Sequence, residues 1–244
     1  MENEGGMRIV STCKQGVYFS CGHEGVTGIC IFDLNCNFPV FISADSKVFD
    51  PCVLVPHNFS KMIRARNEAG RIVVEGNGQP LIARRNAINM LSEEIVVNFP
   101  KGTNIDTLAL QRVSADVIDN GCFSHLALDL DGGSYESEFM LLSLDCVVRG
   151  GKVKIFALKG EVKRIIASGD ANISIRSVAS PALHVEVSGC ATVKIPYYHG
   201  EFDQTEGLVR KLTVIATENG KAIIAGKEYT KDTPEGRILE QPQS

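Results

Sequence analysis

The chain has 244 residues, of which 44% are hydrophobic and 22% are charged, so it can bury a substantial core and lacks the composition of a disordered protein. Its formal net charge of −4 removes the general attraction to phosphate backbones on which most nucleic-acid-binding proteins rely. No apolar run reaches the roughly 18 residues of a membrane span, and the first 15 residues do not resemble a signal peptide. We therefore expect a cytoplasmic protein with no nucleic-acid partner and no membrane span.

The first hundred residues are predicted to form a β region. Short alternating or β-branched runs predict strands at 16–20, 25–34, 39–43, 52–55, 71–75 and 95–99. The segment 60–70 has two interpretations. It is either a helix capped by Ser60 and ended by Gly70, or a hairpin whose first strand, 62–66, turns through 67–70 into the strand at 71–75. We favour the hairpin because the neighbouring segments are strands.

Eight cysteines occur, at positions 13, 21, 30, 36, 52, 122, 146 and 190. A chain of this size needs no covalent staples, so we interpret them as reduced thiols. A zinc site is the alternative, because Cys13, Cys21, His23, Cys30 and Cys36 lie within 24 residues. The spacing contains no Cys-x-x-Cys pair, and Cys30 lies in an apolar run typical of a buried strand. We therefore expect no metal and no cofactor.

Beyond Pro100 the sequence contains an internal repeat. Small-residue corners recur at 114–116, 131–133, 149–151, 168–170 and 188–190, and their middle residues are 17, 18, 19 and 20 positions apart. Short strands precede and follow each corner. A unit of this length cannot bury its own apolar side, so successive units must stack. We predict an all-β, right-handed parallel β-solenoid of about five short rungs, with an antiparallel sandwich as the alternative.

The repeat makes specific predictions about register. One inward column is expected to contain equivalent residues of the five units: Leu110, Leu128, Cys146, Ile165 and Val185. Asp145 should then pair with Arg164 across neighbouring rungs, and Glu136 with Lys154 on a second face. Lys154, Ser174 and Lys194 should form an outward row. Exposed ion pairs of this kind contribute little stability, and we interpret these rows as structural rather than as a binding site.

Both ends of a solenoid need a cap, because the terminal rung exposes unpaired backbone groups. We assign residues 1–100 to an N-terminal β region that caps one end, 101–232 to the repeats with an irregular final rung, and 233–244 to a flexible tail. The segments 212–214 and 222–224, on either side of Asn219-Gly220, are expected to form that final rung or a hairpin. An incomplete cap would favour a homodimer through the open end.

The repeats resemble a known family. Ile165–Ile195 contains the corners Ser168-Gly169-Asp170 and Ser188-Gly189-Cys190, and it is followed by an aromatic and glycine ending, 196–200. These features, with the entry segment 96–102, resemble the putative auto-transporter adhesin head domains and the related bacterial putative-adhesin domains of unknown function. The resemblance covers about residues 95–200. It implies a right-handed parallel β-solenoid, usually exported, with no established catalytic residues.

The sequence does not indicate a catalytic site. The five histidines are scattered, and no phosphate-binding loop, dinucleotide fingerprint or His-Glu-x-x-His motif occurs. A polysaccharide-acting hydrolase or lyase is the alternative, but no second carboxylate obviously faces Asp129 or Asp145. We expect a non-enzymatic protein that presents a rigid surface to a protein or glycan partner. The candidate binding residues are Tyr197, Tyr198 and His199, which could instead plug the apolar column.

Overall fold

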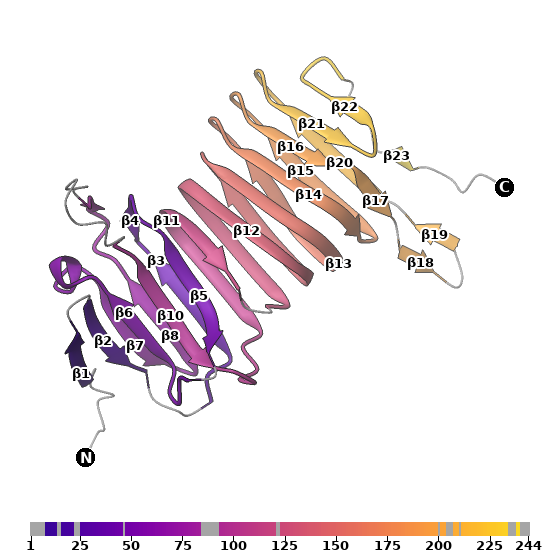
Figure 1. The fold of residues 1–244 in the computed structure, drawn as a ribbon. Helices are drawn as coiled ribbons and strands as arrows, with labels where there is room; N and C mark the ends of the chain where they lie inside the picture. The colour runs from indigo at the N-terminus through magenta and orange to yellow at the C-terminus, as the bar shows by residue number, and fades with distance from the viewer. Residues whose placement is uncertain are drawn as a thin grey trace. The chain divides into compact units, whose positions relative to one another are not determined.

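The computed structural model describes residues 8–13, 16–21, 25–45, 47–83, 93–120, 123–199, 201–203, 207–209, 211–233 and 238–239. Their regular secondary structure is almost entirely β, in a large and mostly parallel sheet (Figure 1). The described part has no α-helix; a 3-10 turn, η1 (His57–Phe59), is its one helical segment. No helix in it has the length and apolar character needed to cross a bilayer. The chain divides into two compact units, Met1–Phe123 and Ser124–Ser244.

The strands of the first unit are β1 (Arg8–Cys13), β2 (Gly16–Ser20), β3 (Gly28–Phe32), β4 (Asn35–Cys36), β5 (Val40–Asp45), β6 (Cys52–Val55), β7 (Arg64–Glu68), β8 (Arg71–Glu75), β9 (Pro80–Leu81), β10 (Ile95–Pro100) and β11 (Thr107–Asp119). The predicted hairpin is confirmed, since β7 and β8 pair in antiparallel fashion. Its turn consists of Ala69 and Gly70 alone, with φ of 48° and 78°. Two central residues with positive φ match the right-handed twist of the flanking strands, which explains the short turn.

The parallel part of the first unit does not follow chain order. Strand β3 lies between β8 and β11, so that Ile29 pairs with Ile72 on one side and with Leu108 on the other. Strand β5 lies in the same way between β10 and β11. The segment β3–β5 therefore lies between the segment β8–β10 on one side and β11 on the other, and both follow it in the chain. Ile29, Ile72 and Leu108 are all buried, which places these three strands in the core of the unit.

The first corner expected from the repeat is displaced in the structure. Ser114–Asp116 lies inside the continuous strand β11. The left-handed turn occurs two residues earlier at Arg112, with φ of 52°, next to Asp33, with φ of 53°. The Arg112 guanidinium donates two hydrogen bonds to the Asp33 carboxylate, at 2.6 and 2.8 Å. This exposed ion pair joins two bends of neighbouring parallel segments.

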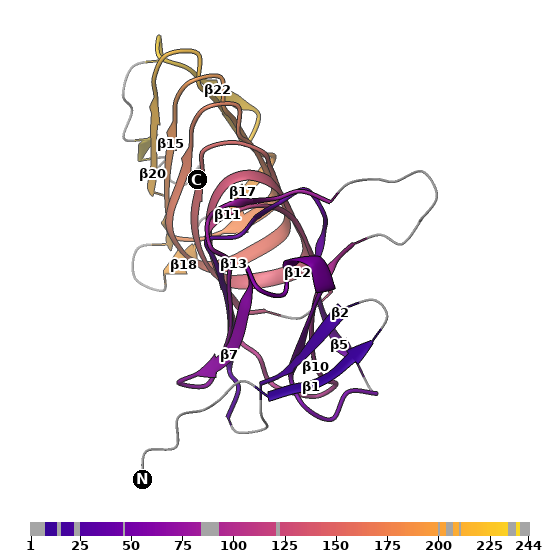
Figure 2. The ribbon, with the colours of Figure 1, turned by 90° about the vertical axis from the view of Figure 1, so that its left-hand side faces the viewer.

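The strands of the second unit are β12 (His125–Val148), β13 (Lys152–Ala167), β14 (Asn172–Ala179), β15 (Ala182–Val187), β16 (Thr192–Ile195), β17 (Tyr197–His199), β18 (Glu201–Asp203), β19 (Gly207–Val209), β20 (Lys211–Ala216), β21 (Lys221–Ile224), β22 (Lys227–Tyr229) and β23 (Ile238–Leu239). Strands β12 to β17, with β20 and β21, pair in parallel. Figure 2, in which the view is turned by 90°, shows the strands of successive repeats stacked one behind another.

Equivalent positions of the second unit pair with each other, as the sequence register predicts. Cys146 pairs with Ile165 and Ile165 with Val185, and all three are buried. Leu128 is also buried in this unit, whereas Leu110 is buried in the first unit, where it pairs with Ile31. The inward positions therefore form continuous apolar columns, which is where these short strands find their hydrophobic core.

Glycine is required at the corners around Gly169 and Gly189 because one corner lies directly on the other. Gly169 and Gly189 have φ of 64° and 65°, and the Cys190 amide donates to the Gly169 carbonyl at 2.7 Å. A Cβ added at Gly189 would lie 2.9 Å from the Gly169 backbone nitrogen and oxygen. At the next corner the left-handed residue is Glu218, with φ of 56°, and its carboxylate accepts a hydrogen bond from the Gly189 amide at 2.7 Å.

The C-terminal strands continue the parallel register. Leu212–Val214 and Ala222–Ile224 do not pair with each other as a hairpin, because β20 pairs with β15 and β21 pairs with β16. The offset increases here to 29 residues, as from Leu183 to Leu212. The extra residues include the antiparallel hairpin β18–β19. Strand β22 then turns back antiparallel on β21.

Candidate functional site

The predicted binding residues lie on β17, and the structure separates them. Strand β17 pairs in parallel with β14, placing Tyr197 beside Ser177 and Tyr198 beside Val178. Alternation along the strand turns Tyr198 inward, where it is 7% exposed and its hydroxyl donates to the Lys211 carbonyl at 3.4 Å. Tyr197 is 56% exposed, and His199 is also exposed. Tyr198 therefore belongs to the apolar column, and Tyr197 and His199 remain available to a partner.

Tyr197 belongs to a group of exposed apolar side chains on the second unit. The register sets Met140, Ala157, Ser177 and Tyr197 side by side on four neighbouring strands. Phe156 immediately precedes Ala157, and Leu142 follows Leu141, whose partner is Leu158. We call four of these residues the apolar strip: Met140, Leu142, Phe156 and Tyr197, which are between 46% and 56% exposed. Exposed large apolar side chains that gather in this way are typical of interaction sites.

The apolar strip has a defined shape and a charged margin. Its central row has large side chains at both ends, Met140 and Tyr197, with the small residues Ala157 and Ser177 between them. Neighbouring strands are about 4.8 Å apart, so the row is about 14 Å long. The Arg176 guanidinium lies over the Phe156 ring, 5.2 Å from its centroid. A cation–π contact of this kind helps to hold the half-exposed ring in place.

Sequence reasoning did not find three members of the strip. Phe139-Met140-Leu141-Leu142 is a run of four apolar residues within a strand, and alternation alone indicates that some of them must point outward. Phe156 follows Ile155, which is buried, and the same argument applies to it. The sequence therefore indicates that some of these apolar residues are exposed, but it does not show that they lie in the same part of the unit as Tyr197.

One outward face of the second unit carries paired charges, as predicted. Arg164 Nε donates to Asp145 Oδ1 at 2.7 Å, which confirms the expected pair. Arg149 contacts Asp129, and it also contacts Asp131 Oδ1 at 2.8 Å. The hydrogen bonds that the Arg149 guanidinium donates to these two carboxylates raise its pKa. The cations and the carboxylates of this face largely neutralise each other.

The same face also carries the pair His184–Glu186 and the carboxylates of Asp129 and Asp131. His184 Nε2 lies 2.7 Å from Glu186 Oε1, and both side chains are partly exposed. Asp131 of the predicted corner at 131–133 and Asp129, two residues before it, share the Arg149 guanidinium. The alternative of a polysaccharide hydrolase requires two carboxylates that act on a bound sugar. Here Asp129 and Asp145, the two carboxylates considered for that role, are each held by an arginine.

The second outward face contains the other predicted pair. Lys154 Nζ contacts both carboxylate oxygens of Glu136 at 3.2 Å. Lys154, Ser174 and Lys194 occupy paired positions on β13, β14 and β16, so the predicted outward row is confirmed. Lys154 and Lys194 are exposed, and Ser174 is half-buried.

The described cysteines lie mainly in the core as free thiols. Cys21, Cys36, Cys52 and Cys146 are buried, Cys30 is half-buried and Cys190 is exposed. Burial, and secondarily the nearby Cys52, raises the pKa of the Cys21 thiol to about 12, and burial raises the pKa of Cys146 to a similar value. A zinc ligand must be a thiolate, so this environment disfavours metal binding.

The zinc hypothesis involves five residues, of which Cys21, Cys30 and Cys36 have described side chains. The side chains of Cys13 and His23 lie outside the described residues. Among the side chains that are described, no three His, Cys, Asp or Glu residues gather closely enough to hold a metal. Cys36 Sγ instead donates to the Phe38 carbonyl at 3.3 Å, which is a structural contact.

Comparisons with known proteins add little to the geometry. No protein-family model matches the chain, and no curated protein matches it. Among solved structures it is similar to a putative adhesin from Bacteroides fragilis, at 13% identity and a TM-score of 0.43, covering 83% of this chain and 94% of that one. It is also similar to a putative cell adhesion protein from Clostridium sporogenes, at 15% identity and a TM-score of 0.30, covering 73% and 71%. A putative adhesin from Parabacteroides merdae is 11% identical, with a TM-score of 0.33, covering 82% and 95%.

Proposed function

We propose that the chain is a non-enzymatic binding protein whose second unit is a right-handed parallel β-solenoid of about five rungs. Parallel pairing of equivalent residues, with offsets near 20, supports the solenoid. Right-handed connections between parallel strands are the strong general preference, which supports the handedness. The function of such a scaffold is to hold side chains in fixed rows.

The observation that carries the binding role is the apolar strip. Met140, Phe156 and Tyr197 are about half exposed, although inward positions on the same strands are almost completely buried. Leaving these apolar surfaces in water costs free energy that a bound partner would recover. The partner is a protein or a glycan, because aromatic side chains on a rigid surface suit both. The alternative, a polysaccharide-acting enzyme, lacks support from the carboxylates described above.

The test is capture of partners by the full chain and by matched variants. Tyr197→Ala and Phe156→Ala should each remove the same partners from the captured set, because both rings are exposed members of the strip. Phe49→Ala is the control, since Phe49 is 83% exposed and belongs to the first unit. A captured set that is unchanged by the two strip variants, or changed equally by Phe49→Ala, contradicts the proposal. Turnover on a glycan panel would favour the enzyme.

We also propose that the chain works in a reducing compartment such as the cytoplasm and associates through the C-terminal end of its second unit. Buried free thiols support the first point. Within the described residues, the outer edge of β20 pairs with β23 only at Lys211 and Leu212, which supports the second. An unpaired strand edge favours addition of another strand. Light scattering that gives a monomer at all accessible concentrations would contradict the association.

A further inference from the structure

The second outward face has an unusual composition, which becomes visible only once the strands are paired. Ten outward positions form two rows across five segments of parallel strand, and we call them the lysine face: Ser134, Glu136, Lys152, Lys154, Asn172, Ser174, Thr192, Lys194, Lys221 and Ile223. Four of the ten are lysines and four carry a hydroxyl or an amide. Only one carboxylate and one apolar side chain are present.

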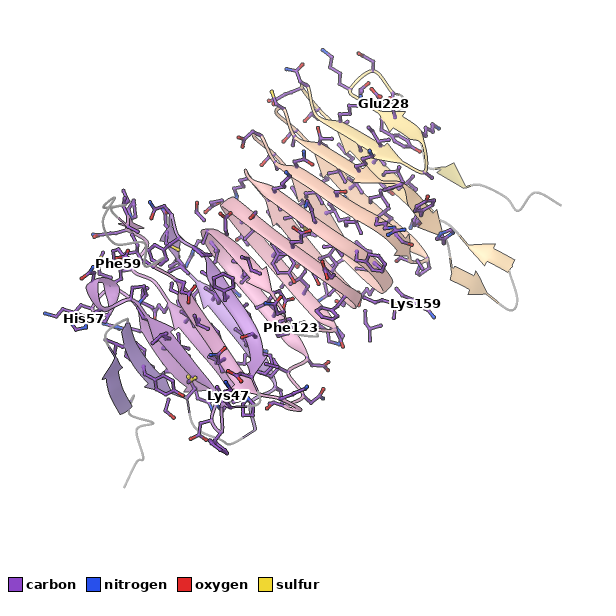
Figure 3. All side chains as sticks on the ribbon, viewed as in Figure 1. Lys47, His57, Phe59, Phe123, Lys159 and Glu228 are labelled. Atoms are coloured by element: carbon purple, nitrogen blue, oxygen red, sulfur yellow. The ribbon has the colours of Figure 1, made fainter. Side chains whose placement is uncertain are left out.

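The charges of the lysine face are not balanced. Lys154 pairs with Glu136, and Lys221 pairs with Glu228 of β22 at 2.7 Å. Glu228 is labelled near the C-terminal end of the sheet in Figure 3. Lys152 and Lys194 have no acidic side chain within ion-pair distance among the described residues. The other charged face of the same unit differs, because its arginines are each held by carboxylates. A face with surplus cations on a chain of net charge −4 therefore needs an explanation beyond solubility.

The lysine face is also rigid and periodic. Parallel strands are about 4.8 Å apart, so Lys154 and Lys194, two strands apart, have backbones about 10 Å apart, and Lys152 and Lys221 about 14 Å. Backbone hydrogen bonds fix these spacings, as from the Asn172 amide to the Gly151 carbonyl at 2.8 Å. Little backbone entropy is lost when an extended ligand binds across such a surface, because the positions are already ordered.

The chemistry of the face identifies a class of ligand. Lysine ammonium groups attract carboxylates as compact charges, whereas Ser, Thr and Asn side chains can both donate and accept hydrogen bonds with hydroxyls. Acidic groups that recur along an extended chain, with hydroxyls between them, are the features of an acidic polysaccharide. Single-stranded nucleic acids fit less well, because their binding relies on aromatic side chains that stack on bases, and the ten positions include no aromatic residue.

We propose that the lysine face binds an acidic polysaccharide, with its carboxylates at Lys152 and Lys194 and its hydroxyls on the Ser, Thr and Asn side chains between them. This inference replaces the structural interpretation of the row drawn from sequence. It rests on the proposed binding role and adds the chemical class of the ligand. It does not need the apolar strip, which borders the lysine face where Phe156 follows Lys154 as the next outward residue of β13.

The test measures binding of the full chain to polygalacturonate, with neutral dextran and single-stranded DNA as comparison ligands. Polygalacturonate should bind and dextran should not. Binding should weaken strongly between 0.1 and 1 M NaCl, because the screening length falls from about 10 to about 3 Å. Lys152→Gln combined with Lys194→Gln should lower the affinity about fivefold or more, as expected when two partly screened ion pairs are lost.

A second pair of substitutions provides the matched control. Lys159→Gln combined with Lys163→Gln makes the same change in net charge at exposed lysines outside the lysine face, and Lys159 extends from β13 in Figure 3. This variant should bind within about twofold of the unchanged chain, because screening limits the reach of distant charges. Circular dichroism of all variants checks the fold.

Three outcomes would overturn the inference: no binding to polygalacturonate, equal binding to single-stranded DNA, or equal losses in the two double-lysine variants. The result also separates this inference from the proposed function. If polygalacturonate fails to bind while Tyr197→Ala still removes partners, the inference fails alone. If neither surface has a ligand, the binding role itself fails.

Discussion

Replacement of Gly189 by alanine tests how closely the corners of the second unit lie on each other. The residue has φ of 65°, and a Cβ would lie 2.9 Å from the nitrogen and oxygen and 3.2 Å from the Cα of Gly169. A left-handed alanine costs about 1–2 kcal/mol. Forcing a carbon against fixed backbone atoms adds about 1–3 kcal/mol, as in overpacked cores. The expected loss of unfolding free energy is therefore about 3 kcal/mol.

Gly226→Ala provides the control for the backbone conformation alone. Gly226 has φ of 80°, and nothing lies within 4 Å of the position that an alanine Cβ would take, so its substitution should cost only about 1–2 kcal/mol. Urea unfolding followed by circular dichroism measures both. With a slope of about 2–3 kcal/mol/M, Gly189→Ala should lower the midpoint by about 1 M or more, and Gly226→Ala by about half as much. Equal midpoint shifts at unchanged slope would refute the close stacking of the corners.

The remaining predictions concern the buried tyrosine and the thiols. Tyr198→Ala should lower the unfolding free energy by about 3 kcal/mol, because it empties an inward position. Tyr197→Ala should change the unfolding free energy by less than about 0.5 kcal/mol, because Tyr197 is exposed. Equal urea midpoints for the two variants would contradict the inward orientation of Tyr198. Burial raises the pKa of Cys146 from its ordinary value of 9.0 to about 12, so the folded state keeps a proton that the unfolded state loses, and stability should fall as pH rises above about 9. The urea midpoint should drop less between pH 8 and pH 10 in Cys146→Ala than in the unchanged chain, and an identical drop would contradict the assignment. Iodoacetamide at pH 8 should modify Cys190 before Cys146 in the native chain, as measured by peptide mass spectrometry; early modification of Cys146 would show that its site opens readily.

Part of the fold could be predicted because it depends on local patterns that repeat. Alternation identifies the strands, and recurring small corners set the register that pairs Cys146 with Ile165 and Asp145 with Arg164. The hairpin at β7–β8 was predictable for the same reason, since two short strands flank a turn that ends in glycine. In each case the relevant partners lie at a short or a constant separation in the sequence.

The first unit was less predictable because its pairings have no constant separation. Strand β3 lies between β8 and β11, which follow it by different distances along the chain. Alternation predicts that Ile29 is buried, but it does not indicate which strands cover it. The corner at Arg112 shows the same limit, because a charged residue takes the left-handed conformation there and its partner Asp33 is remote in sequence.

The sequence by itself determined the β character of the chain, the corner spacing and which side chains of the later repeats share a row. Only the tertiary structure decided which aromatic residue is exposed, since Tyr197 and Tyr198 are adjacent and differ in the side of β17 on which they lie. It also decided that Met140 and Tyr197 share one row and that, among the described residues, Lys152 and Lys194 form no ion pair. The physical reason is that alternation and spacing act locally, whereas exposure and charge balance depend on every strand packed alongside.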